Sequence, residues 1–96
     1  MALPKALPNM AAGNIAMAVG ANGVCKCVIT ACASSNDALG DAYREIKFGY
    51  QDVMLAGGAE AAITPFAIGG FQALTALSTT EDPARASIPF DNVLSS

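Results

Sequence analysis

Two short segments of the chain, residues 24–30 and 52–56, are nearly free of the polar–apolar alternation expected of strands with one exposed face. The first is rich in β-branched side chains, and the second has Val-Met-Leu-Ala at its centre. Apolar strands of this kind are typical of parallel sheets that helices cover on both faces. Any fold for this chain therefore has to bury both segments.

Residues 33–48, between these segments, have the pattern of an amphipathic helix. Apolar side chains recur at helical spacing, with acidic residues towards the start and basic residues towards the end, as the helix dipole favours. Gly49 provides a stop. Strand, helix and strand joined by short links predict one βαβ unit in an α/β fold, flanked by helices over 9–19 and 64–76, the second interrupted near Gly69–Gly70.

The composition limits what such a chain can be. Hydrophobic residues make up 53% of the 96 residues and charged residues only 14%, which is too apolar for a small independent domain. The chain is therefore expected to be a fragment, or to bury its strands in a partner. Residues 6–25 and 61–80 are uncharged and long enough to span a membrane, but proline, asparagine, glycine and threonine interrupt both. No signal peptide is apparent at the start, so the expected location is the cytoplasm.

Charge and cysteine content exclude other classes. The net charge is −3 and the five basic residues are scattered, which argues against nucleic-acid binding. Three closely spaced cysteines, Cys25, Cys27 and Cys32, do not suggest a disulfide framework. Cys25 and Cys27 lack a second ligand pair, and the chain has no histidine. We expect neither a metal site nor a cofactor.

Cys32 is the candidate for chemistry because it follows the first predicted strand and precedes the central helix. Ligands bind at this edge of open α/β sheets, and the positive end of a helix dipole favours a reactive thiolate. Small neighbours leave room for a sharp turn and a substrate. The residues alone leave two interpretations open: Cys32 is a nucleophile, or it is a buried core thiol.

Several motifs in order resemble the β-ketoacyl-acyl carrier protein synthases. Thr-Ala-Cys-Ala-Ser-Ser over 30–35, followed by Ala-Leu-Gly over 38–40, resembles their nucleophile segment. Further similarity lies at 9–14, 52–60, 76–79 and 89–91, so that the resemblance runs from about Leu3 to Asp91. A series of motifs in the right order is much more specific than any one of them.

The resemblance implies a thiolase-like α/β fold, of which residues 1–96 would be part of the N-terminal half. It implies decarboxylative condensation, in which Cys32 takes an acyl group from a carrier-protein thioester and passes it to the carbanion formed from malonyl-acyl carrier protein. The Cys32 N–H would supply half of an oxyanion hole, and Ala67, Ile68 and Phe71 would line the acyl pocket, although ordinary core packing also explains these three. No cofactor is implied.

Other residues carry weaker implications. Glu60 matches a structural position of the family, with a role as general base as the alternative. Asp37 stands where many relatives have histidine, and Asp91 fits a scaffold turn. Ser34 and Ser35 are expected at the start of the helix.

The family pattern breaks off after Asp91, and the resemblance assigns the condensation step to two histidines and a lysine that the chain lacks. We therefore expect a fragment of the N-terminal half that does not condense substrates alone. An alternative is an inactive assembly piece that self-associates through a sheet edge, because family members are homodimers. A thiolase, which shares the fold and a cysteine nucleophile, is a lesser alternative.

Overall fold

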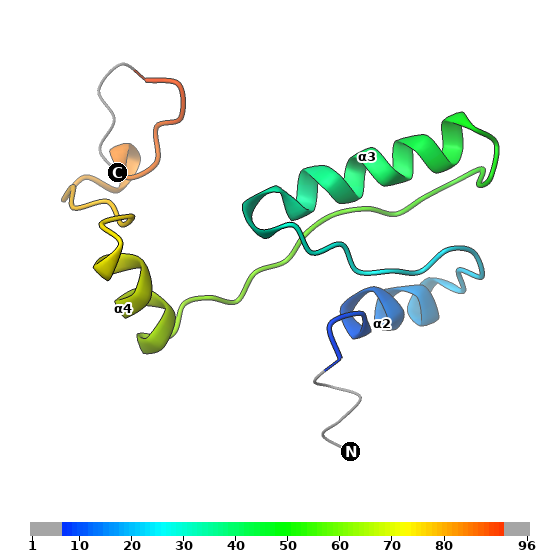
Figure 1. Ribbon diagram of the computed structural model, residues 1–96, viewed down its shortest axis with the longest axis horizontal. Coiled ribbons are helices and arrows are strands. Elements are labelled where there is room, and N and C mark those ends of the chain that lie inside the picture. Colours follow the sequence, from blue (N-terminus) through cyan, green and yellow to red (C-terminus); the bar gives the residue numbers. More distant parts are fainter. Residues whose placement is uncertain (1–6, 92–96) are drawn as a thin grey trace. The chain divides into compact units, whose positions relative to one another are not determined.

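The computed structural model describes residues 7–91, and these fall into two compact units that divide between Ala59 and Glu60. The break in the family pattern that was predicted after Asp91 falls on residues outside the described range. Each unit is described in turn. Figure 1 shows helices joined by extended chain in both.

The first unit contains α2 (Met10–Val19), the short 3₁₀ helix η1 (Ala31–Ala33) and α3 (Ser34–Lys47). Helix α2 ends at Gly20, whose φ of 71° is left-handed, and α3 is followed by Gly49 at φ 80°. Glycine adopts these angles at little cost, which explains both helix ends. The predicted helices over 9–19 and 33–48 are therefore confirmed to within one residue at each end.

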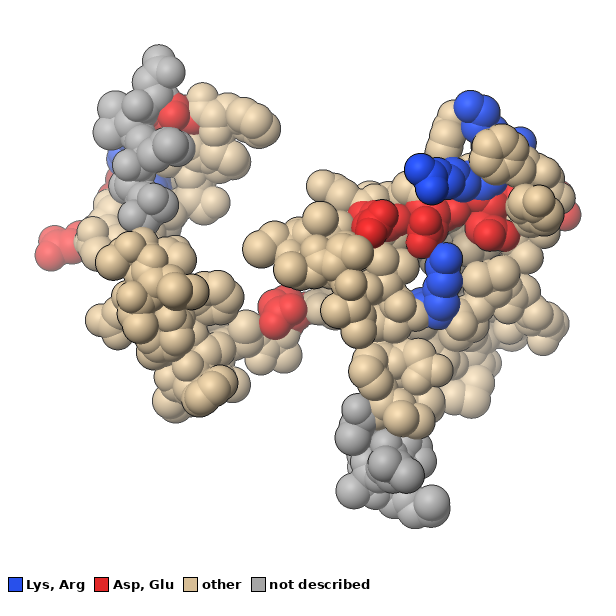
Figure 2. All heavy atoms as spheres, viewed as in Figure 1, with Lys and Arg blue, Asp and Glu red and all other residues tan. Residues whose placement is uncertain are grey.

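Helix α3 is amphipathic and carries most of the charge in its unit. Acidic side chains gather along it in Figure 2, with basic side chains nearby. The Lys26 ammonium lies 3.0 Å from the Asp41 carboxylate, which links the extended segment before η1 to the helix. The Lys47 ammonium lies 5.5 Å from the centre of the Tyr43 ring. Lys26 and Tyr43 are exposed and Asp41 is partly covered, so solvent screens both pairs and they add little stability.

Residues 24–30 and 52–56 do not form the predicted strands. Both are extended and run in the same direction in Figure 1, but no ladder of backbone hydrogen bonds joins them within residues 7–91. Their beginnings meet where the Gln51 side chain lies against Gly23. The βαβ unit is therefore not confirmed. A parallel pair gains its stability from neighbouring strands and from helices on both faces, and no strand is formed anywhere in residues 7–91 to stand beside these segments.

The second unit contains α4 (Pro65–Ala73) and the 3₁₀ helix η2 (Pro83–Arg85). Thr64 caps α4, because its Oγ1 accepts a hydrogen bond of 3.2 Å from the Ala67 amide, and Pro65 stands at the first helical position. The predicted interruption at Gly69–Gly70 is wrong, since α4 continues through both glycines. A good cap and a proline start offset the low helix propensity of glycine.

Almost nothing in the described part of the chain is buried. Ala42 of α3 is the one buried hydrophobic residue among residues 7–91, with 8% of its surface exposed. Large apolar side chains lie open to solvent in both units, including Met17, Val53, Ile63, Phe66 and Leu74. No helix of the described segment is long and apolar enough to cross a membrane. The apolar surface expected for a buried sheet therefore lies exposed.

Candidate active site at Cys32

The chain turns sharply immediately before Cys32. Thr30 ends the extended segment at φ −135°, and Ala31 then adopts a left-handed φ of 52°. Residues other than glycine rarely adopt this region, because Cβ crowds the neighbouring backbone. The turn leads into η1 and directly into α3, so that Cys32 lies in an elbow between extended chain and helix. The helix after Cys32 was predicted, whereas extended chain precedes Cys32 in place of the predicted strand.

The Ser34 hydroxyl bridges the two residues before Cys32. Its Oγ accepts a hydrogen bond of 2.9 Å from the Thr30 amide and donates one of 2.7 Å to the Ala31 carbonyl. The Ala33 amide also donates to the Thr30 carbonyl at 3.1 Å. These three hydrogen bonds join the two residues before Cys32 to the two residues after it. Ser34 and Ser35 begin α3, as predicted, but the bridge across the elbow was not predicted.

Cys32 presents two groups that a nucleophilic site requires. Its side chain is exposed in the described part of the chain, so a reagent has access to the thiol. Its backbone amide donates a hydrogen bond to no other residue in the segment 7–91. A backbone N–H without a partner beside a nucleophile is what an oxyanion hole needs.

Exposure alone does not distinguish Cys32 from the other two cysteines. Cys25 and Cys27 are also exposed, and both lie in the extended segment before the elbow. Any difference in reactivity among the three thiols therefore has to come from local geometry and not from access. Cys25 and Cys27 therefore serve as reference thiols when the reactivity of Cys32 is measured.

Gly58 approaches the start of α3 close to the elbow. A Cβ placed on Gly58 would lie 3.1 Å from the Ser35 Cβ and in contact with the Ser35 Oγ. Neighbouring Gly57 has open space around it. The extended segment after α3 thus touches the N-terminal turn of the helix at a position that only a residue without a side chain fits well.

The residues predicted for the acyl pocket lie on α4, in the second unit. Ala67, Ile68 and Phe71 are spaced so that they share one side of that helix, and Ile68 and Phe71 are 38% and 48% exposed. Cys32 belongs to the first unit. Asp37 lies in the first turn of α3, and Glu60 is exposed at the start of the second unit.

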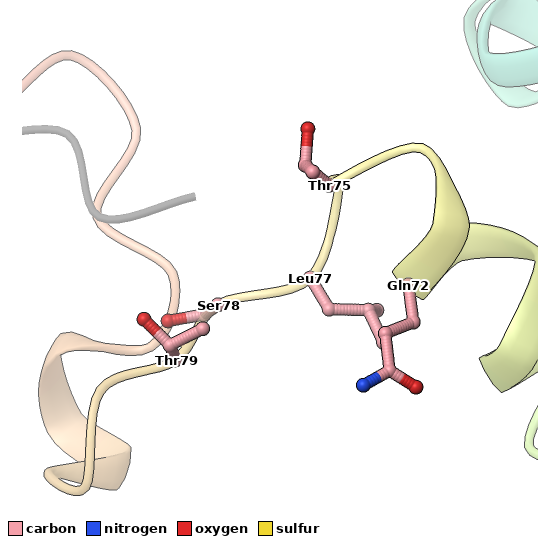
Figure 3. A pocket seen from close by; sticks show the side chains of 5 residues that line it. All are labelled: Gln72, Thr75, Leu77, Ser78 and Thr79. Atoms are coloured by element: carbon pink, nitrogen blue, oxygen red, sulfur yellow. The ribbon is translucent and has the colours of Figure 1, made fainter.

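A small hollow of about 310 Å³ lies at the end of α4 (Figure 3). Hydroxyl and amide groups form much of its lining, and none of the predicted site residues contributes to it; the lining residues are Gln72, Thr75, Leu77, Ser78 and Thr79. The Thr75 hydroxyl donates to the Leu74 carbonyl at 2.6 Å. Across residues 7–91, no cluster of His, Cys, Asp or Glu is able to hold a metal ion.

Comparison with known proteins gives one family. Residues 1–94 match the family model described as "Beta-ketoacyl synthase, N-terminal domain". The chain is 47% identical over 90 residues to a 3-oxoacyl-[acyl-carrier-protein] synthase 2 of Synechocystis sp., an alignment that covers 93% of this chain and 22% of the relative. It is 45% identical over 91 residues to the mitochondrial 3-oxoacyl-[acyl-carrier-protein] synthase of Arabidopsis thaliana, with 93% and 20% covered.

A third relative is the 3-oxoacyl-[acyl-carrier-protein] synthase 2 of Staphylococcus aureus, which is 41% identical over 88 residues, or 92% of this chain and 22% of the relative. The chain therefore spans about a fifth of the length of the curated relatives that it matches.

Proposed function

Because the chain belongs to the β-ketoacyl synthase family, we propose that it carries the acyl-accepting part of a 3-oxoacyl-[acyl-carrier-protein] synthase of fatty acid biosynthesis, with Cys32 as the nucleophile. The observation that carries this proposal is the elbow, in which an exposed thiol and an unpartnered amide belong to the same residue. The residues around it, Thr-Ala-Cys-Ala-Ser-Ser, resemble the nucleophile segment of the family.

The proposed step is acyl transfer between two thiols. The Cys32 thiolate attacks the carbonyl carbon of an acyl thioester on a carrier protein, and the Cys32 amide donates a hydrogen bond to the oxyanion that forms. The carbon–sulfur bond to the carrier then breaks, and the carrier thiolate leaves and takes up a proton. A thioester on Cys32 remains, which a carbanion is able to attack because a thiolate is a good leaving group.

Substrate and partner follow from the same proposal. The partner is an acyl carrier protein that bears acyl groups, and malonyl-acyl carrier protein supplies the second substrate. Ala67, Ile68 and Phe71 of α4 would contact the acyl chain, which the exposed apolar surface of Ile68 and Phe71 supports. We propose that residues 1–96 form part of the N-terminal half of a thiolase-like fold. We propose the cytoplasm as the place where the protein acts.

We assign to this chain the acyl-accepting step alone. The resemblance places decarboxylation and condensation on two histidines and a lysine, and the 96 residues contain no histidine. The acyl-accepting step is therefore the part of the reaction for which residues 1–96 account.

The test is incubation of the purified chain with an acyl-acyl carrier protein, followed by intact-mass and peptide mass spectrometry. We expect a single acyl adduct, on the peptide that contains Cys32. Cys25 and Cys27 serve as internal controls because they are equally open to solvent. An absence of adduct, or equal acylation of the three cysteines, would overturn the proposed role of Cys32.

The exposed apolar surface supports a second candidate, an assembly function that needs no chemistry. With Ala42 as the one buried hydrophobic residue of the segment 7–91, self-association would cover side chains such as Val53 and Phe66. We expect gel filtration with light scattering to give a mass that rises from monomer to dimer with concentration. A monomer at all concentrations would exclude this candidate and leave the acyl-transfer proposal to its own test.

A further inference from the structure

Ser34 occupies an unusual place for a serine at the start of a helix. A capping serine ordinarily accepts a hydrogen bond from an amide further along its own helix. In α3 no side chain caps the helix in this way, and the Ser34 hydroxyl instead points back across the elbow to Thr30 and Ala31. Its two bonds thus serve the turn that precedes Cys32 and not the helix that follows it.

The two bonds act on the one strained residue of the elbow. Ala31 holds a left-handed φ of 52°, and such conformations persist only where the surroundings hold them. The Ser34 hydroxyl bonds the carbonyl of Ala31 and the amide of the residue before it, so it fixes the backbone on both sides of the strained angle. The direction in which Cys32 leaves the turn depends on that angle.

We propose that Ser34 is a positioning residue, whose hydroxyl holds Ala31 in the left-handed conformation and thereby aims the Cys32 thiol and amide into solvent at the start of α3. This inference rests on the proposed function of Cys32. The role requires a group that donates and accepts at once. Serine and threonine have such a group, and alanine has none.

The experiment compares five forms of the full chain: wild type, Ser34→Ala, Ser34→Thr, Ser35→Ala and the double variant that combines Ser34→Ala with Ala31→Gly. Ser35→Ala is the matched control, because it removes a hydroxyl from the next residue of α3 without touching the bridge. Each form is treated with iodoacetamide, and the rate at Cys32 is divided by the mean rate at Cys25 and Cys27. The same ratio in guanidinium chloride gives the value without structure.

We expect the wild-type ratio to exceed the denatured ratio. We expect Ser34→Ala to lower it about threefold to tenfold, the range that corresponds to the net contribution of one hydrogen bond. Ser34→Thr and Ser35→Ala should keep the wild-type ratio. Adding Ala31→Gly to Ser34→Ala should restore part of the loss, because glycine adopts a left-handed φ without help. If Ser34 acted only on the general stability of the chain, Ala31→Gly would not restore the ratio.

A second measurement does not depend on thiol chemistry. The Thr30 amide donates to Ser34 Oγ, so its hydrogen exchange, followed by NMR, should be faster in Ser34→Ala and unchanged in Ser35→Ala. Equal ratios and equal Thr30 exchange in wild type and Ser34→Ala would overturn the inference, as would a wild-type ratio equal to the denatured one.

The outcomes separate this inference from the proposed function. Acyl transfer to Cys32 that proceeds equally fast in wild type and Ser34→Ala overturns the role of Ser34 alone. A Ser34-dependent alkylation ratio in a chain that takes no acyl group from the carrier protein overturns the proposed function alone.

Discussion

Replacing Cys32 with serine is expected to abolish acyl transfer from an acyl carrier protein, although the change is one atom. At neutral pH the serine hydroxyl stays protonated and has no base beside it, whereas a thiol supplies the thiolate that attacks. The backbone of the elbow should be preserved, since serine is similar in size and the turn is held by Ser34 and not by Cys32. Peptide mass spectrometry after incubation with the acyl carrier protein measures the loss directly.

Cys25→Ser and Cys27→Ser are the matched controls, since both thiols are exposed and lie outside the elbow. Each should acquire the same adduct as the wild-type chain. An acyl group that moves to another cysteine in Cys32→Ser, at the wild-type rate, would show that the chain is acylated wherever a thiol is exposed. In that case the elbow would have no special role.

Replacing Gly58 with valine is expected to remove the preference of reagents for Cys32. A side chain at Gly58 would meet the Cβ and Oγ of Ser35, so the extended segment and the start of α3 have to separate. Overpacking of this kind typically costs about 1–3 kcal/mol, and here it acts on the first turn of the helix that carries the elbow. The alkylation rate of Cys32 relative to Cys25 and Cys27 measures the effect.

Gly57→Val is the control for this prediction. Gly57 is the neighbouring glycine and, like Gly58, does not have a positive φ. A side chain at Gly57 would extend into open space. It should leave the ratio unchanged. A ratio that falls equally in both variants would trace the effect to stiffening of the extended chain. An unchanged ratio in Gly58→Val would show that a side chain at this position is accommodated without moving the elbow.

The helices could be predicted from the sequence because their signals are local. The alternation of apolar and charged residues marks α3, and Gly20 and Gly49 mark helix ends whose left-handed angles the structure shows. The strands over 24–30 and 52–56 could not be predicted reliably, since pairing depends on segments that neither stretch encodes. Apolar sequence shows that a segment needs to be covered, and says nothing of what covers it.

The sequence predicted correctly that a helix begins just after Cys32, because the signals of that helix are local. The strand predicted before Cys32 is extended chain, and the role of Cys32 stays a prediction. Three features around Cys32 were not predicted, because they depend on the exact path of the backbone. They are the bridge by Ser34, the left-handed φ of Ala31 and the close approach of Gly58 to Ser35. Two adjacent serines look alike in sequence, and only the structure shows that one of them reaches back.

The near absence of burial has a thermal consequence. Melting a protein raises its heat capacity because apolar groups pass from a dry interior into water. In the described segment Ala42 is the one buried hydrophobic residue, a few others such as Ile46 are about half covered, and Ile63 and Phe66 are already 88% and 93% exposed. The heat-capacity step of this chain alone is therefore small and its melting gradual, and a sharp calorimetric transition would appear only once other polypeptide covers those side chains.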